Sequence, residues 1–144
     1  ACMAGASVDD VDKLYDFGVS MGLAFQLQDD WLDVYGDPKV FGKNIGGDIL
    51  CNKKTYMLIT ALTQADDKQS EELQRWISAT DAEPAEKISA VTHIYNEMRI
   101  GEQCMAMADS YYAEGLALLD GISLPAERKE MLKQFVCSLM NRKV

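Results

Sequence analysis

The feature that most constrains the fold is a long stretch without proline, residues 8–35, whose apolar and polar side chains recur with the period of an α-helix. Each residue of an α-helix turns the chain by about 100°. Gln26, Asp29, Asp30 and Asp33 therefore share an arc of about 100° on one side of the expected helix. The other side is apolar and carries Leu23, Phe25, Leu27, Trp31, Leu32 and Val34. We expect a helix with one polar stripe on an otherwise apolar surface.

The aspartates of this stripe predict a metal site. Carboxylates four positions apart, such as Asp29 and Asp33, repel each other and weaken an isolated helix. A bound divalent cation would offset that repulsion. Ligand sets made only of oxygen suit Mg²⁺, which keeps several waters and binds one or two carboxylates together with substrate phosphates. A solvated acidic surface is the alternative interpretation when the aspartates are considered alone.

The composition fits a single all-α segment over residues 1–144. Apolar residues make up 48% and charged residues 26% of the chain, as in ordinary globular proteins. Alternating Val, Ile and Thr patterns of β-strands are nearly absent, and only three prolines interrupt the chain. We therefore expect a bundle of long helices.

Capping and turn signals divide the chain into separate helices. Ser7 is expected to begin the first helix, Asp48 to cap the second, and Gly121 to break the chain before the last. Residues 36–47, rich in Gly, Asp, Pro and Asn, are expected to form a loop. The expected helices cover residues 8–35, about 48–65, about 67–80, about 84–119, and the segment from Pro125 onward.

Charge and cysteine usage narrow the partners and the compartment. The net charge is −9, and only residues 127–144 are basic, so nucleic acid is not expected as the main partner. No apolar run approaches the ~20 residues that a membrane span needs. The four cysteines lie far apart, without a CxxC motif, so we expect free thiols in a reducing compartment and a cytoplasmic location.

The run from Gly22 to Asp37 (GLAFQLQDDWLDVYGD), followed by Gly42-Lys43, Gly47-Asp48 and Lys53-Lys54-Thr55-Tyr56, resembles the trans-isoprenyl diphosphate synthases, the polyprenyl synthetases. The likeness is to the second aspartate-rich motif of that family and to the lysine loop that follows it. A lone DDxxD motif would be weak evidence. Here it is preceded by FQ and followed at the expected spacing by GK and by Asp48 and Lys53.

The resemblance implies the C-terminal part of the isoprenoid synthase fold, a bundle of long helices around a deep cavity. It also implies a reaction in isoprenoid biosynthesis, of the farnesyl or geranylgeranyl type. An allylic diphosphate ionises with the help of Mg²⁺, the double bond of isopentenyl diphosphate attacks the allylic cation, and a proton is lost. The partners implied are these two diphosphates, and the full-length parent is expected to form a homo-oligomer.

The resemblance also implies roles for individual residues. Asp29 and Asp33 would hold Mg²⁺, Asp30 would support them, and Asp48 would reach a metal-bound water. Gln26 would lie near the developing cation. Lys43 and Lys53 would contact the allylic diphosphate, and the basic Arg142 near the C-terminus would contact a substrate diphosphate.

The chain also departs from the family pattern. The DDxxD motif occurs once, and the first aspartate-rich motif with its following arginine pair is absent. We therefore expect this chain to be the C-terminal half of such an enzyme and to be inactive when isolated. We also expect it to self-associate, or to bind poorly ordered partners, through apolar surfaces that the absent helices would cover. Met131, Phe135, Leu139 and Met140 are expected to form the apolar stripe of the last helix.

Two other functions compete with this interpretation. A non-catalytic partner subunit of the same family would keep the fold and lose one motif, although the intact FQxxDD run and both lysines argue against such decay. A generic Mg²⁺-binding helical module would explain the carboxylates but not the spacing of Lys43 and Lys53. His93 has no Glu-x-x-His partner on another helix, which argues against a di-iron site.

Overall fold

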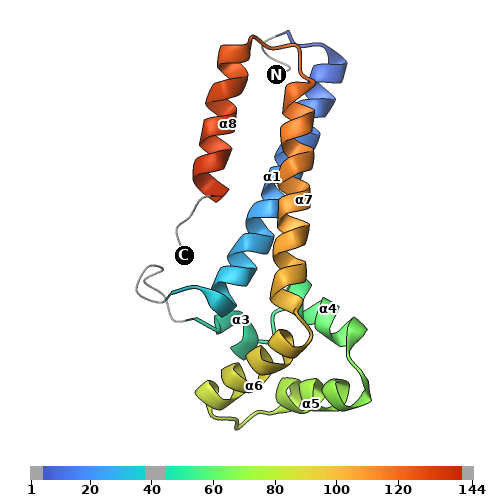
Figure 1. The fold of residues 1–144 in the computed structure, drawn as a ribbon, viewed down its shortest axis with the longest axis vertical. Helices are drawn as coiled ribbons and strands as arrows, with labels where there is room; N and C mark the ends of the chain where they lie inside the picture. Colours follow the sequence, from blue (N-terminus) through green and yellow to red (C-terminus); the bar gives the residue numbers. More distant parts are fainter. Residues whose placement is uncertain (1–4, 38–44, 141–144) are drawn as a thin grey trace. The chain divides into compact units, whose positions relative to one another are not determined.

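The computed structural model describes residues 5–37 and 45–140. Every regular element in this part of the chain is a helix, which confirms the all-α prediction (Figure 1). The helices are α1 (Val8–Tyr35), α3 (Gly47–Leu50), α4 (Tyr56–Gln64), α5 (Asp67–Ser78), α6 (Pro84–Glu97), α7 (Ile100–Asp120) and α8 (Ala126–Met140).

The bounds of α1 confirm the longest predicted helix. Ser7 accepts a hydrogen bond of 3.1 Å from the backbone N–H of Asp10, as expected for a capping residue. At the other end, Gly36 N donates to the carbonyl of Leu32 at 2.9 Å, which closes the last turn. The predicted acidic stripe therefore lies on one continuous helix.

The prediction of one helix over residues 48–65 was wrong. The chain forms the short helix α3 and then α4, because Asn52 adopts a left-handed conformation with φ of 52° and ends the helical hydrogen bonding. Thr55 then caps α4 and accepts from Leu58 N at 3.1 Å. Asp48 does not cap α3 as predicted; Gly46, with φ of 83°, holds that position and Asp48 lies in the first turn.

The prediction of one helix from Pro84 to about residue 119 was also wrong. Pro84 does lie in the first turn of α6, but the helix ends at Glu97 and α7 begins at Ile100. Arg99 lies between them with φ of 56°, a conformation that cannot continue a right-handed helix. The predicted short helix appears as α5, which begins with a capping box formed by Asp66 and Gln69.

The described residues pack as two compact units, and both contain parts of α1 and α7. The described residues of the first unit are 5–28 and 106–140. Its core joins one face of α1 to α7, α8 and the turn between them through Phe17, Leu119, Ile122 and Val136. Gly115 packs against the end of the Met21 side chain, which would have to shift if this position carried a Cβ atom.

The described residues of the second unit are 29–37 and 45–105, and they contain α3, α4, α5 and α6. It also contains the end of α1, where Tyr35 packs against Gly101 so closely that a Cβ on this glycine would lie 2.7 Å from Tyr35 Cε2. The Tyr35 hydroxyl forms a hydrogen bond of 2.9 Å with Asn96 Oδ1. The buried side chains of the unit include Leu32, Met57, Leu73, Ile94, Ile100 and Cys104. These contacts fix the aspartate-bearing end of α1 within the second unit.

Candidate functional site

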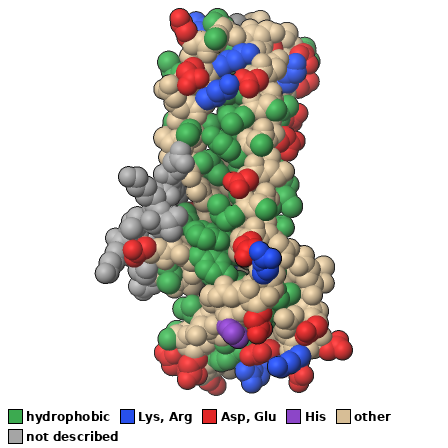
Figure 2. All heavy atoms as spheres, in the orientation of Figure 1, with side chains coloured by type: hydrophobic (Ala, Val, Ile, Leu, Met, Phe, Trp, Pro, Cys, Tyr) green, Lys and Arg blue, Asp and Glu red, His purple; other side chains and the backbone are tan. Residues whose placement is uncertain are grey.

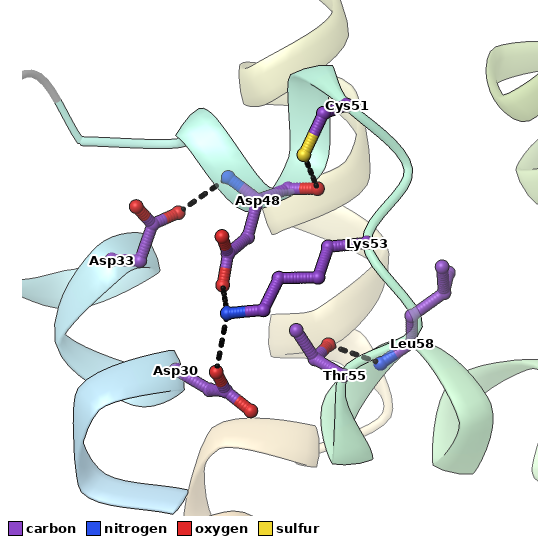
Figure 3. Close-up of polar contacts among 7 residues, drawn as sticks. All are labelled: Asp30, Asp33, Asp48, Cys51, Lys53, Thr55 and Leu58. Carbon is purple, nitrogen blue, oxygen red and sulfur yellow. Dashed lines mark hydrogen bonds and ion pairs between the residues drawn. The ribbon is translucent and has the colours of Figure 1, made fainter. Parts of the chain in front are cut away.

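The centre of the candidate site is the ammonium group of Lys53, which lies between two carboxylates (Figure 3). Lys53 Nζ donates to Asp48 Oδ2 at 2.7 Å and to Asp30 Oδ1 at 3.0 Å. Asp30 comes from α1, Asp48 from α3, and Lys53 from the segment after α3. The three residues all belong to the second unit, so one packed body places them.

Asp33 joins this group through the backbone of α3. Its Oδ2 accepts from Asp48 N at 2.9 Å (Figure 3). Its own carbonyl accepts from Gly46 N at 2.6 Å. Gly46 is the residue type that this approach requires, because its φ is positive and a Cβ would lie 2.6 Å from Ile88 Cδ1. A carboxylate near the start of a helix accepts one of the N–H groups that lack helical partners. Through these two hydrogen bonds, Asp33 holds Gly46 and the start of α3 against the end of α1.

Burial and neighbouring charges shift the pKa values of Asp33 and Lys53. Burial raises the pKa of the Asp33 carboxyl, and the negative charges of Asp48 and Asp29 add to that rise. The hydrogen bond from Asp48 N and the charge of Lys53 oppose it. The pKa of Lys53 is raised above its ordinary value, first by its hydrogen bond to Asp48 and then by Asp30, against the effect of burial. Lys53 is therefore a permanent cation among several carboxylates.

The carboxylates differ in their exposure to solvent. Asp30 is 5% exposed, Asp33 and Asp48 are half-buried, and Asp29 is exposed. The side chain of Lys53 is 44% exposed, so its ammonium is accessible from solvent while it contacts both carboxylates. The acids of the stripe predicted on α1 therefore range from the buried Asp30 through the half-buried Asp33 to the exposed Asp29.

The other predicted site residues lie elsewhere or outside the described part of the chain. Gln26 lies one turn before Asp30 on α1, in the first unit, and is exposed. Lys43 and Arg142 fall outside the described residues, so their predicted diphosphate contacts stay predictions.

The donor set fits a hard divalent cation in chemistry but does not form a closed cage. Asp29, Asp33 and Asp48 offer only oxygen, which suits Mg²⁺. Among residues 5–37 and 45–140, no group of three or more His, Cys, Asp and Glu side chains is arranged to hold a metal ion by itself. Mg²⁺ usually takes one or two protein carboxylates and completes its shell with water and phosphate, so an open set of acids is consistent with this ion.

Three residues near the site were not predicted from the sequence. Asn52 forms the left-handed turn before Lys53, and Lys87 on α6 is 5% exposed and contacts Asn52. Cys104 is fully buried, and burial, with a smaller contribution from Asp30, raises the pKa of its thiol to about 12. The signal for Lys87 was present in the sequence, because a lysine four positions before the buried Val91 lies on the apolar face of its helix.

The family model "Polyprenyl synthetase" matches residues 1–98, more than half of the chain. The chain belongs to the polyprenyl synthetase family. This assignment confirms the resemblance inferred from the second aspartate-rich motif and its lysine loop.

Individual relatives agree with the family. A short chain isoprenyl diphosphate synthase from Methanothermobacter thermautotrophicus is 33% identical over 93% of this chain and 37% of its own length. Farnesyl pyrophosphate synthase from Bos taurus is 34% identical over 74% of this chain and 29% of its own. A crystal structure of a geranylgeranyl pyrophosphate synthase matches with a TM-score of 0.85 and 34% identity, over 98% of this chain and 44% of that one. The predicted isoprenoid synthase fold is therefore confirmed.

The chain spans less than half the length of these relatives. It contains one DDxxD sequence, Asp29–Asp33, and the helices described around it. Within the described residues, no helix combines the length and apolar character that crossing a membrane would require.

Proposed function

We propose that the parent protein condenses an allylic diphosphate with isopentenyl diphosphate, and that residues 1–144 supply the half of the active site that grips the allylic diphosphate. The observation that carries this proposal is the Lys53 ammonium held between Asp30 and Asp48, with Asp33 attached to the same turn. Carboxylates can bind a metal ion and a fixed ammonium can bind phosphate, so these residues together suit a ligand that combines metal and phosphate.

In the proposed reaction, the bond between the allylic carbon and the diphosphate oxygen breaks, and negative charge develops on the leaving diphosphate. Mg²⁺, when bound, would neutralise that charge, and the residues proposed to hold it are Asp29 and Asp33, with Asp48 acting through a metal-bound water. Lys53 adds a positive charge that is already oriented before the substrate binds. Lys43 and Arg142 are proposed to contact diphosphate on the strength of the family resemblance.

Asp30 has a different proposed role from its neighbours. It is buried and contacts the Lys53 ammonium, so it orients the lysine and supports the acids beside it. The double bond of isopentenyl diphosphate then attacks the allylic carbon, a carbon–carbon bond forms, and the released diphosphate accepts the proton that the new chain loses. Gln26 is proposed to present a neutral oxygen to the allylic cation, because the amide offers a dipole without a competing charge.

The proposal predicts that the full-length protein elongates an allylic diphosphate by one five-carbon unit when it is given labelled isopentenyl diphosphate and Mg²⁺. Asp33→Asn should abolish elongation, whereas Asp67→Asn, at an exposed site on α5, should leave it unchanged. A folded full-length protein that elongates no allylic diphosphate would contradict the proposal. Elongation that Asp33→Asn leaves unchanged would also contradict it. Stimulation of a separate synthase by such an inactive protein would instead support the partner-subunit alternative.

We further propose that residues 1–144 alone are inactive, since they contain one aspartate-rich motif. The isolated chain should bind Mg²⁺ only weakly, because its described acids form no closed cage. Elongation by the isolated chain would contradict this part of the proposal.

A further inference from the structure

Lys87 is a buried lysine whose partners are neutral. It is 5% exposed, and its Nζ donates to Asn52 Oδ1 at 2.8 Å and makes a longer contact of 3.5 Å with the Leu50 carbonyl. Within the part of the chain that the structure describes, no carboxylate forms an ion pair with Lys87. Lysine is almost never fully buried unless it is paired. Its position here therefore requires a reason beyond ordinary core packing.

The partner of Lys87 is the residue that turns the chain toward the site. Asn52 has a φ of 52°, in the left-handed region that Asn tolerates better than most residues. Its Nδ2 also donates to the carbonyl of Ile77 at 3.0 Å, near the end of α5. The Asn52 amide is therefore engaged at both its oxygen and its nitrogen, which ties this single turn to α5 and to α6.

Lys53 follows Asn52 directly and takes its direction from that turn. Its backbone N–H donates to the Asp48 carbonyl at 2.9 Å, while its ammonium contacts Asp48 and Asp30. Lys53 and Lys87 also line the same small cavity, of about 10 Å³, together with Val34, Ile49, Leu73 and Val91. A cavity of this size holds at most about one water molecule. On this side the packed lining leaves the turn little free space, while the Lys53 side chain is 44% exposed on the other.

We propose that Lys87 is a positioning residue that acts through Asn52 to hold the Lys53 ammonium at the acidic site. This inference rests on the proposed function, in which Lys53 contacts the allylic diphosphate. An ammonium offers three donors from a long, thin side chain, so it can reach an amide and a carbonyl on one turn. An apolar side chain of similar length would fill the space but would leave the Asn52 amide oxygen and the turn without this donor.

The test is a double-mutant cycle in the full-length protein with Lys87→Met, Lys53→Met and the double variant. Residues that orient metal ligands typically change activity by about 10–100-fold when removed, and we take the same scale for a residue that orients Lys53. We expect Lys87→Met to lower kcat/KM for the allylic diphosphate by about 10-fold or more. In the Lys53→Met background it should cause little further loss. Equal losses in both backgrounds, or no loss in either, would overturn the proposal. Lys68→Met on α5, an exposed lysine, is the matched control.

A second readout separates this proposal from the proposed function. Acylation of Lys53 by a lysine reagent, followed by mass spectrometry, reports how firmly its ammonium is held and needs no catalysis. Lys87→Met should raise the acylation rate of Lys53 severalfold and leave that of Lys68 unchanged. An unchanged rate at Lys53 would overturn the positioning role, whatever the activity of the protein. If instead the wild-type protein is folded but inactive while this rate rises, the proposed function fails and the positioning role stands.

Asn52→Gly provides a milder variant if Lys87→Met does not fold. Glycine accepts a positive φ without strain, so the turn keeps its backbone conformation while both side-chain hydrogen bonds of Asn52 disappear. The same faster acylation of Lys53 is expected. An unchanged rate in a folded Asn52→Gly protein would contradict the role assigned to the Lys87–Asn52 contact.

Discussion

The carboxylate of Asp33 on α1 accepts a hydrogen bond of 2.9 Å from the backbone N–H of Asp48 on α3. This contact joins the last acid of the aspartate motif to the first turn of the helix that precedes the lysine segment. The consequence is that a change at Asp33 affects both the charge of the site and the placement of its loop. The two effects can be separated by measuring stability and activity independently.

Asp33→Asn should make the metal-free protein more stable relative to wild type as the pH rises from about 3 to 7, a range that brackets the ordinary pKa of Asp. Burial raises the pKa of Asp33 in the folded protein, so the folded state binds more protons than the unfolded state between the two pKa values. Wild-type stability from this group is therefore lost as the pH rises through that window. Asparagine has no such titration and keeps an oxygen that can accept from Asp48 N.

Urea unfolding at both pH values, in the presence of a chelator, measures this difference in the free energy of unfolding. Asp67→Asn provides the control at an exposed position. A difference between Asp33→Asn and wild type that does not change with pH would show that Asp33 carries no shifted pKa.

Two glycines on long helices should respond in opposite ways to alanine. Gly101→Ala places a Cβ 2.7 Å from Tyr35 Cε2, so it should destabilise the protein by about 1–3 kcal/mol. Gly22→Ala meets no atom within 4 Å in the middle of α1 and should stabilise the protein by about 0.5–1 kcal/mol. Thermal or urea unfolding of the two variants measures both effects, and equal destabilisation by both would contradict the packing described for Gly101.

Features that depend on residues close together in the sequence were predicted correctly. Features that depend on one dihedral angle or on a distant segment were not. The helix α1 and its aspartate stripe were predictable, because period and capping are local properties of residues 7–36. The break between α6 and α7 depends on one residue, Arg99, in a left-handed conformation, and hydrophobic periodicity does not report single dihedral angles. Gly101 packs on Tyr35, which lies on a helix far earlier in the chain, and a local sequence pattern cannot predict such a contact.

The same distinction applies to the site. The family resemblance assigned Asp30, Asp48 and Lys53 to one site, and the structure places the Lys53 ammonium in contact with both carboxylates. The spacing could not indicate that Lys53 would contact both acids, because that depends on the left-handed turn at Asn52. Lys87 was missed for a related reason, since lysine is ordinarily a surface residue and its partner lies on a distant segment.

Apolar surface on the first unit predicts self-association of the isolated chain. Hydrophobic side chains lie exposed on the surface in Figure 2, and the largest exposed ones in this unit include Tyr15, Val19, Leu23, Met131 and Phe135. On α8, Met131 is 72% and Phe135 60% exposed, whereas Leu139 and Met140 are half-buried, so within the described residues the first part of the apolar stripe faces solvent. Patches of this kind mark surfaces that associate with other proteins.

Phe135→Glu should weaken self-association of residues 1–144 by about 10-fold or more, because burying one such side chain contributes about 1.5–3 kcal/mol. Analytical ultracentrifugation over a concentration series measures the change, with Glu127→Gln on the same helix as the control. A wild-type chain that stays monomeric at every concentration would contradict the prediction.

The central claim is that the acids of α1 bind a diphosphate through Mg²⁺, and calorimetric titration of inorganic diphosphate into the full-length protein tests it most directly. We predict that wild-type protein and the Asp67→Ala control bind diphosphate tightly only when Mg²⁺ is present. Asp29→Ala and Asp33→Ala should each weaken that binding by about 10-fold or more. Diphosphate affinity that is the same with and without Mg²⁺, or that neither substitution changes, would contradict the account.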